Sequence, residues 1–287
     1  MAQATTTATA TRGTAQRHGL TLAMSIGGEE AVNELPRLRE YGVGAEITDF
    51  IGVATWQGDY RAHARRWAAA LRGFPGDKCL HGAFIDLAPG ALEPEVVAFA
   101  RRRHQQSLEI AATLGCDLLV VHSDFPPREA QPSQHAERAA RLTDYFGTLA
   151  TEAAPLGITI VIENIRDGNP RQLADLAAAI ALPNLGLSLD VGHANLYGPT
   201  YALDEWALAL APTLRHVHLH DNDGRFDRHW GVGAGTMNFR AFLATVAALA
   251  PAPRVTIEAL PRADAWQTLE GLIADGWYTP SGLGGTH

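Results

Sequence analysis

The stretch ITIVIENIRDGNPRQLADLAAAIALPNLGLSLDVGH, residues 158–193, decides the fold. It contains two apolar runs, which end in carboxylates at Glu163 and Asp190, and between them a segment of helical period. Short β-type runs that alternate with helical segments are typical of βα units, which build parallel sheets. The stretch therefore predicts two parallel strands that each carry an acidic side chain to the same edge of the sheet.

The same alternation continues in both directions from this stretch. Eight runs are expected strands: Leu20–Ile26, Gly44–Thr48, Cys79–Ile85, Leu118–His122, Thr159–Glu163, Gly186–Asp190, His216–His220 and Val255–Glu258. The expected helices lie near 29–41, 60–73, 94–114, 134–154, 171–181, 203–210, 239–249 and 264–274.

Eight repeats without a leftover domain favour a closed barrel over an open doubly wound sheet. A chain of 287 residues is also long enough for such a barrel, which typically needs about 250 residues. We predict an α/β protein with a single (β/α)8 TIM barrel over residues 19–287. Residues 1–18 are rich in Ala and Thr and are expected to form a disordered tail.

Composition narrows the class of partner and the compartment. The formal charge of −8 would repel a polyanion, so nucleic acid is not an expected partner. No apolar run approaches the roughly 20 residues of a membrane-spanning helix, so no membrane contact is expected either. Cys79 and Cys116 both lie beside apolar runs, which predicts buried free thiols in a reducing compartment and a cytoplasmic location. The oligomeric state stays open, with a homo-oligomer possible.

Histidines and carboxylates gather at the predicted strand ends. In TIM barrels the catalytic groups lie at the carboxyl ends of the strands, so these residues are expected to converge on one barrel mouth. Buried carboxylates need a partner, and metal coordination is one of the usual ones. The candidate metal or substrate ligands are His81, His122, Glu163, Asp190, His193, His218, Asp227, His229 and Glu258.

Side chains alternate between the two faces of an extended strand, and this places three nearby histidines on one face. His216, His218 and His220 point to one side of the seventh strand at three depths. We expect His218 to be a metal ligand, His216 to pack inside the barrel, and His220 to lie at the rim and contact substrate. Trp230 offers an aromatic face to a sugar, although packing explains it equally well.

Alternation also places Asp227 and His229 on one face, with Arg228 pointing away. Three further acidic residues near strand ends, Glu46, Asp86 and Asp124, are interpreted as supporting or surface residues.

Four short strings resemble a known group of proteins. These are Val161-Ile162-Glu163-Asn164, Leu189-Asp190-Val191-Gly192-His193, His216-Val217-His218-Leu219-His220-Asp221-Asn222 and Ile257-Glu258. They look like the xylose-isomerase-like barrel superfamily, which contains sugar isomerases and epimerases together with endonuclease IV. The resemblance covers roughly residues 20–275, and its specificity lies in the ligand positions.

Resemblance to the ketose 3-epimerases and inosose isomerases implies one divalent ion, Mn²⁺, Co²⁺ or Zn²⁺. The ion would be held by Glu163, Asp190, His218 and Glu258. Glu163 and Glu258 would then act as base and acid at the α-carbon of a sugar, through a metal-stabilised enediolate. His193 would hold a substrate oxygen. Arg225 lies near the position of a substrate-binding arginine in these enzymes, but it is not clearly in register.

Resemblance to endonuclease IV implies a larger set, because all nine candidate ligands match its trinuclear zinc cluster. In that case Glu163 would bridge two metals, and the cluster would activate water against a phosphodiester. The acidic charge fits a small sugar or polyol better than DNA. We therefore expect a metal-dependent sugar isomerase or epimerase, with one metal ion or as many as three. The alternatives are a trinuclear-metal phosphoesterase, a lyase that uses the same enolate chemistry, and a non-catalytic scaffold.

Overall fold

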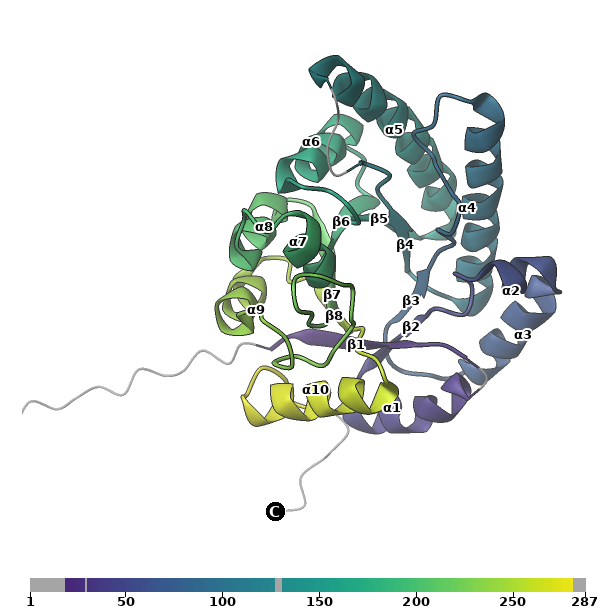
Figure 1. Ribbon diagram of the computed structural model, residues 1–287. Coiled ribbons are helices and arrows are strands. Elements are labelled where there is room, and N and C mark those ends of the chain that lie inside the picture. Colours follow the sequence, from purple (N-terminus) through teal and green to yellow (C-terminus); the bar gives the residue numbers. More distant parts are fainter. Residues whose placement is uncertain (1–18, 29, 127–130, 281–287) are drawn as a thin grey trace, which may run out of the picture.

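A computed structural model describes residues 19–28, 30–126 and 131–280. Eight parallel strands form a closed barrel in sequence order, and the helices surround it (Figure 1). The predicted (β/α)8 fold is thus confirmed. The predicted tail over 1–18 and the last residues of the predicted domain, 281–287, lie outside the described residues.

The strands are short and almost entirely buried, as expected of a sheet that is covered on both faces. Their bounds are β1 Thr21–Ile26, β2 Gly44–Ile47, β3 Lys78–His81, β4 Leu118–His122, β5 Thr159–Glu163, β6 Leu185–Asp190, β7 Leu214–Leu219 and β8 Arg254–Ile257. The predicted bounds of β4 and β5 agree with these, whereas the predicted β3 ran on to Ile85.

The prediction for β3 was wrong at its carboxyl end because the apolar residues beyond His81 serve another purpose. The Gly82 N–H still bonds to the Val120 carbonyl, at 2.9 Å, and the chain then turns away from the ladder. Phe84 and Ile85 line the cavity described below. Apolar alternation alone does not distinguish a strand from a cavity wall.

The helices follow the strands as predicted, with two additions. Their bounds are α1 Leu35–Tyr41, α2 Val53–Gln57, α3 Tyr60–Ala70, α4 Pro94–Leu114, α5 Pro132–Ala153, α6 Pro170–Ile180, α7 Val191–Tyr197, α8 Leu203–Leu210, α9 Phe239–Ala248 and α10 Arg262–Ala274. The short α2 and α7 were not expected, since segments of this length show little periodicity. The Asp190 carboxylate begins α7 by accepting the N–H of His193 at 2.7 Å.

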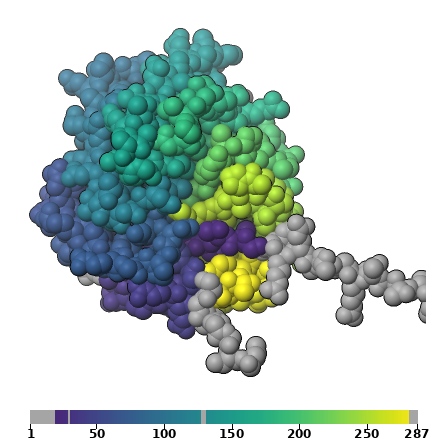
Figure 2. Space-filling model, turned by 180° about the vertical axis from the view of Figure 1, so that it is seen from behind, coloured from purple at the N-terminus to yellow at the C-terminus, as the bar shows by residue number. Residues whose placement is uncertain are grey.

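The two ends of the described chain close the barrel. β1 pairs with β8, and the Leu20 N–H donates to the Trp277 carbonyl at 3.2 Å. Figure 2 shows the purple residues at the start of the described chain beside the yellow residues near its end. At the amino ends of the strands, the Arg254 guanidinium bonds to Asp77 and Asp117, at 3.2 and 3.0 Å. Ion pairs at this end of a barrel serve stability, which leaves the other end for chemistry.

No helix within the described ranges is both long and apolar enough to cross a bilayer.

Candidate metal and active site

A cavity of about 990 Å³ opens at the carboxyl ends of the strands. Most of the candidate ligands line it, namely His81, His122, Glu163, His193, Asp227, His229 and Glu258. Asp190 and His218 lie directly beneath, with no exposed surface. The barrel thus brings all nine candidate ligands together, although they come from six strands and the loops that follow them.

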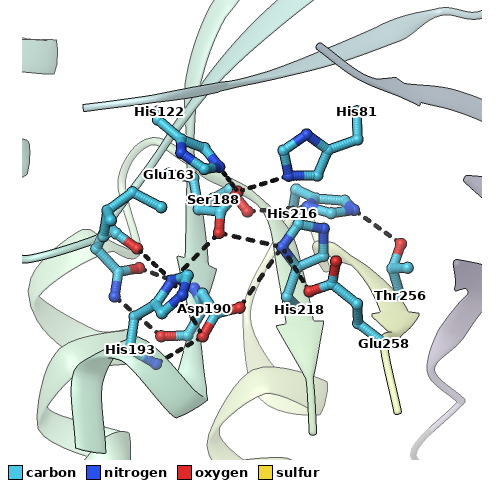
Figure 3. Close-up of polar contacts among 12 residues, drawn as sticks. His81, His122, Glu163, Ser188, Asp190, His193, His216, His218, Thr256 and Glu258 are labelled. Atoms are coloured by element: carbon cyan, nitrogen blue, oxygen red, sulfur yellow. Dashed lines mark hydrogen bonds and ion pairs between the residues drawn. The ribbon is translucent and has the colours of Figure 1, made fainter. Parts of the chain in front are cut away.

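Glu163, at the end of β5, is the centre of the cluster (Figure 3). Its Oε2 atom lies 3.5 Å from His81 Nε2 and 3.6 Å from His122 Nε2. Its Oε1 atom lies 3.4 Å from Nδ1 of both His193 and His218. The carboxylate is 1% exposed, and Oε2 has no hydrogen-bond partner. A buried oxygen without a donor is unfavourable unless a cation compensates it.

His218, in β7, forms a second focus beside Glu163. Its Nδ1 atom lies 3.4 Å from a Glu163 oxygen, 3.7 Å from Asp190 Oδ2 and 3.4 Å from Glu258 Oε2. This nitrogen is fully buried and makes no hydrogen bond. Oxygens of three carboxylates therefore lie within 3.7 Å of this one nitrogen.

The charges in the cluster polarise one another strongly. Burial alone would lower the pKa of His218, but the carboxylates of Glu258 and Glu46 raise it well above its ordinary value. Burial alone would raise the pKa of Asp190, but His193 and His220 lower it to about 2. Nearby histidines, His218 first, likewise hold the pKa of Glu163 well below its usual range, against the effect of burial. The carboxylates of Glu163 and Asp190 thus favour the ionised form and nearby positive charge, which a divalent cation supplies as well as protons do.

An outer group joins the cluster through Asp227. Its Oδ2 atom lies 3.2 Å from His193 Nε2 and 3.0 Å from His229 Nε2. The Nδ1–H groups of these two histidines donate to backbone carbonyls, of Asn164 at 3.0 Å and of Glu258 at 2.9 Å. Since each Nδ1 is occupied by its carbonyl, each Nε2 is left as the ligand atom.

The donor set fits a divalent metal ion. Two groups share Glu163, with ligand atoms within 4.8 Å of one another: one is His81, His122 and Glu163, and the other is Glu163, Asp190 and His218. Imidazole nitrogens and carboxylate oxygens are the ligands expected for Zn²⁺, Mn²⁺ or Co²⁺. The unpartnered Glu163 Oε2 and His218 Nδ1 belong to these groups. The residues present are therefore suited to hold a metal.

Three residues expected to contact substrate do not line the cavity. His220 follows the end of β7 and is fully buried, with Nε2 bonded to both oxygens of Asp190 at 3.1 and 3.0 Å. Helix α7 covers it, because Gly192 lies directly against its ring. Arg225 is exposed in the loop after β7, and Trp230 pairs through its backbone with Asp221. The exposed rim position expected of His220 is wrong, because α7 covers the end of the strand at this point.

Several cavity residues were not singled out from the sequence. Arg166 and Arg262, after β5 and β8, line the cavity, and Phe84 stacks on His122 at a centroid distance of 4.1 Å. Their positions just after strand ends are the one sequence signal that indicates them. Asp86 and Asp124, which were interpreted as supporting or surface residues, also line the cavity.

The remaining interior predictions agree with the structure. His216 is fully buried inside the barrel, where it bonds to Ser188, Thr256 and Glu46. Glu46 is fully buried and lies beside His216 and His218, not on the surface. Cys79 and Cys116 are buried free thiols.

Comparison with known proteins gives the same architecture. The TTHB071 protein from Thermus thermophilus, solved after soaking with ZnCl2, is 29% identical with a TM-score of 0.74, over 89% of this chain and 97% of that one. A D-tagatose 3-epimerase-like protein is 21% identical with a TM-score of 0.74, over 88% and 96% of the two chains. An L-ribulose 3-epimerase is 16% identical with a TM-score of 0.70, over 89% and 94%. At the two lower identities the likeness shows the fold alone.

Sequence relatives point the same way. The uncharacterized protein MJ1311 of Methanocaldococcus jannaschii is 28% identical over 166 residues, which are 56% of each chain. The chain thus spans about half the length of the curated relatives it matches. The sequence profile of the xylose isomerase-like TIM barrels matches residues 42–273, and the chain belongs to this family.

Proposed function

We propose that the protein is a metal-dependent isomerase or epimerase that acts on a sugar or related polyol through an enediolate. The observation that carries the proposal is the position of two glutamates at the floor of one cavity. Oxygens of Glu163 and Glu258 both lie 3.4 Å from the unpartnered His218 Nδ1. Two carboxylates beside one ion site are suited to general acid and base catalysis of a proton transfer at the α-carbon of a carbonyl compound.

Glu163, Asp190, His218 and Glu258 would hold the ion, with Mn²⁺, Co²⁺ or Zn²⁺ as candidates. When bound, the ion supplies Lewis-acid polarisation of the substrate carbonyl, and this makes the neighbouring C–H more acidic. The ligand set suits all three metals, so the choice among them is left to experiment.

The protein's own groups would move the proton. Glu258 is 16% exposed on the cavity side and is placed to accept a proton from the α-carbon. In an isomerisation Glu258 would return the same proton to the neighbouring carbon. In an epimerisation Glu163, on β5, would have to carry a proton of its own and deliver it to the opposite face, and Glu258 would release the abstracted proton to solvent. His193, which is 13% exposed, lies between Glu163 and Asp227 and would hold a substrate oxygen. Burial of these groups limits the access of water to the enediolate.

The cavity supports a small substrate. About 990 Å³ lies in the range of small-molecule sites and accommodates a monosaccharide or polyol. Its lining is mixed and includes the apolar Phe84 and Leu87 as well as the basic Arg166 and Arg262. We propose a sugar or polyol as the partner, no nucleic acid, and a cytoplasmic enzyme, consistent with two buried free thiols.

The proposal is tested by incubating the protein in D₂O with Mn²⁺ or Co²⁺ and a panel of ketoses, both phosphorylated and free. Deuterium should enter the α-carbon of at least one sugar, detected by mass spectrometry. Glu258→Gln should remove this exchange. The matched control is Glu270→Gln on the exposed face of α10, where the glutamate pairs only with Arg37 within the described chain. Absence of exchange across the panel would contradict the proposal, and exchange followed by loss of a substituent would indicate a lyase.

A second candidate, a multinuclear metal phosphoesterase, is favoured by one observation. Asp227 Oδ2 lies between two histidines, and His81 and His122 both face Glu163, so ligands for more than one ion are present. This candidate requires close to three metals per chain and cleavage of an abasic-site duplex or a simple phosphodiester. One metal per chain without cleavage would exclude it.

A further inference from the structure

A buried carboxylate lies in the barrel interior, beneath the candidate metal site. Glu46, in β2, has no exposed surface. Its Oε1 atom lies 2.8 Å from His218 Nε2, and its Oε2 atom lies 3.0 Å from His216 Nε2. The Cys79 thiol donates to the same Oε2 at 3.5 Å. The two histidines are the only ion-pair partners of Glu46 in the described part of the chain.

The hydrogen bond to Glu46 determines which nitrogen of His218 carries a proton. An ionised carboxylate only accepts hydrogen bonds, so His218 Nε2 must donate to it. In the neutral imidazole the lone pair is then on Nδ1, the atom that faces Glu163, Asp190 and Glu258 without a hydrogen-bond partner. A bare lone pair that faces three carboxylate oxygens is unfavourable, so either a proton or a metal ion lies between this nitrogen and the oxygens. A metal ion that replaces the proton is bound through Nδ1, because Nε2 stays occupied by its bond to Glu46. Glu46 therefore prepares Nδ1 as a metal ligand.

The neighbouring histidine has a separate set of bonds. His216 Nδ1 lies 2.9 Å from the Ser188 hydroxyl, and His216 Nε2 lies 2.8 Å from the Thr256 hydroxyl as well as near Glu46. Among the ion pairs of the described chain, none joins His216 to the carboxylates of Glu163, Asp190 or Glu258. Glu46 thus bonds to two histidines with different surroundings. His218 reaches the candidate metal site, whereas His216 bonds only within the barrel interior among the described residues.

We propose that Glu46 is a positioning residue that fixes the tautomer of His218 and thereby sets the affinity of the site for its divalent ion. A carboxylate that receives the second N–H of a ligating histidine orients the ring and raises its basicity as a ligand. The inference rests on the metal site of the proposed function and is independent of the sugar chemistry.

The test is a comparison of Zn²⁺ affinity in the full-length protein and in Glu46→Gln, by competition with a chromophoric chelator. The amide of Gln accepts a bond from one histidine, but its NH₂ group then faces the N–H of the other. Removal of such outer carboxylates typically costs about 10- to 100-fold in metal affinity, and the same loss is expected here. The matched control is Ser188→Ala, which breaks the other branch of the network and should leave Zn²⁺ affinity unchanged.

Unchanged Zn²⁺ affinity in a folded Glu46→Gln variant would overturn the inference, and so would an equal loss in Ser188→Ala. A second measurement needs no variant of Glu46. In the Zn²⁺-loaded protein with nitrogen-labelled histidine, NMR should show His218 with its hydrogen on Nε2 and a metal-type shift on Nδ1, assigned by comparison with His218→Asn. A hydrogen on Nδ1 would equally refute it. Because these readouts do not involve turnover, missing sugar exchange would count against the proposed function alone.

Discussion

Glu163 connects the two candidate metal groups at the scale of single residues. One of its oxygens faces His81 and His122, and the other faces His193 and His218. A carboxylate with a histidine pair at each oxygen can bridge two metal ions. It can equally bind one ion and act as a general acid or base. The two roles of Glu163 differ in whether they need Asp227. A cluster of several ions would use Asp227 as a ligand, whereas a single ion beside Glu163, Asp190 and His218 would not.

The first prediction compares Glu258→Gln with Asp227→Ala. If one ion acts, Glu258→Gln should reduce deuterium exchange by about 10²- to 10⁴-fold, the usual contribution of a general acid or base. Asp227→Ala should retain most of the exchange, because Asp227 contacts His193 and His229 and none of the four residues expected to hold the single ion. Both variants are assayed with saturating Mn²⁺, and bound metal is counted in each. Loss of metal and exchange together in Asp227→Ala would contradict a one-ion mechanism.

At the scale of elements, the short helix α7 keeps His220 in place. The helix begins at Asp190, whose carboxylate also accepts from His220 Nε2. Gly192, in the first turn, packs so closely on the His220 ring that an added Cβ would overlap it. Since His220 has no exposed surface, the ring has little room to move.

The second prediction is that Gly192→Ala lowers the free energy of unfolding by about 1–3 kcal/mol, as overpacking of a core does. The variant should also bind Zn²⁺ more weakly, because the displaced ring no longer holds the Asp190 carboxylate. Chemical denaturation and chelator competition measure the two effects. Gly147→Ala in α5 is the control, because its Cβ would meet only Ile180 at 3.8 Å, and it should stabilise the helix by about 0.5–1 kcal/mol. Equal stability of the two variants would contradict this reading of α7.

The third prediction concerns the packing of α4 on α5. Burial lowers the pKa of His104 in α4 to about 4, and the Tyr145 hydroxyl in α5 lies 2.8 Å from its Nδ1. An unfolded chain binds a proton at this histidine near pH 6.5, so between pH 6.5 and 4 the unfolded state holds more protons. Stability should therefore fall as the pH falls through this window, by about 3 kcal/mol from this residue. The free energy of unfolding of His104→Gln, measured at several pH values, should depend less on pH than that of the unsubstituted protein. The same pH dependence in both proteins would contradict the role given to His104.

At the scale of the whole molecule, the sequence indicated the barrel and the ligand residues because both depend on repetition. Each buried run that ends in His, Asp or Glu carries that side chain to the same rim, so convergence of the nine candidate ligands follows from the eight-strand closure. Contacts that depend on where a strand stops were harder to predict. His220 lies one residue past β7, and the helical turn of α7 above it has no periodic signal.

The two histidine partners of Glu46 could not be predicted from the sequence. Glu46 lies in β2, far along the chain from the two histidines of β7. Closure of the barrel brings the Glu46 carboxylate to these histidines. Arg166, in the loop after β5, and Arg262, the first residue of α10, were missed for a related reason, because no hydrophobic periodicity fixes the direction of side chains at these positions.

The central claim is that residues from separate strands hold a divalent ion at one end of the barrel, and its most direct test is the metal content of protein purified without chelator. Elemental analysis should find at least one Zn²⁺, Mn²⁺ or Co²⁺ ion per chain, removable by chelator and restored by titration. In Glu163→Gln, which removes a ligand shared by both groups, the content should fall. A metal-free protein that also takes up no Zn²⁺ or Mn²⁺ on titration would contradict the account.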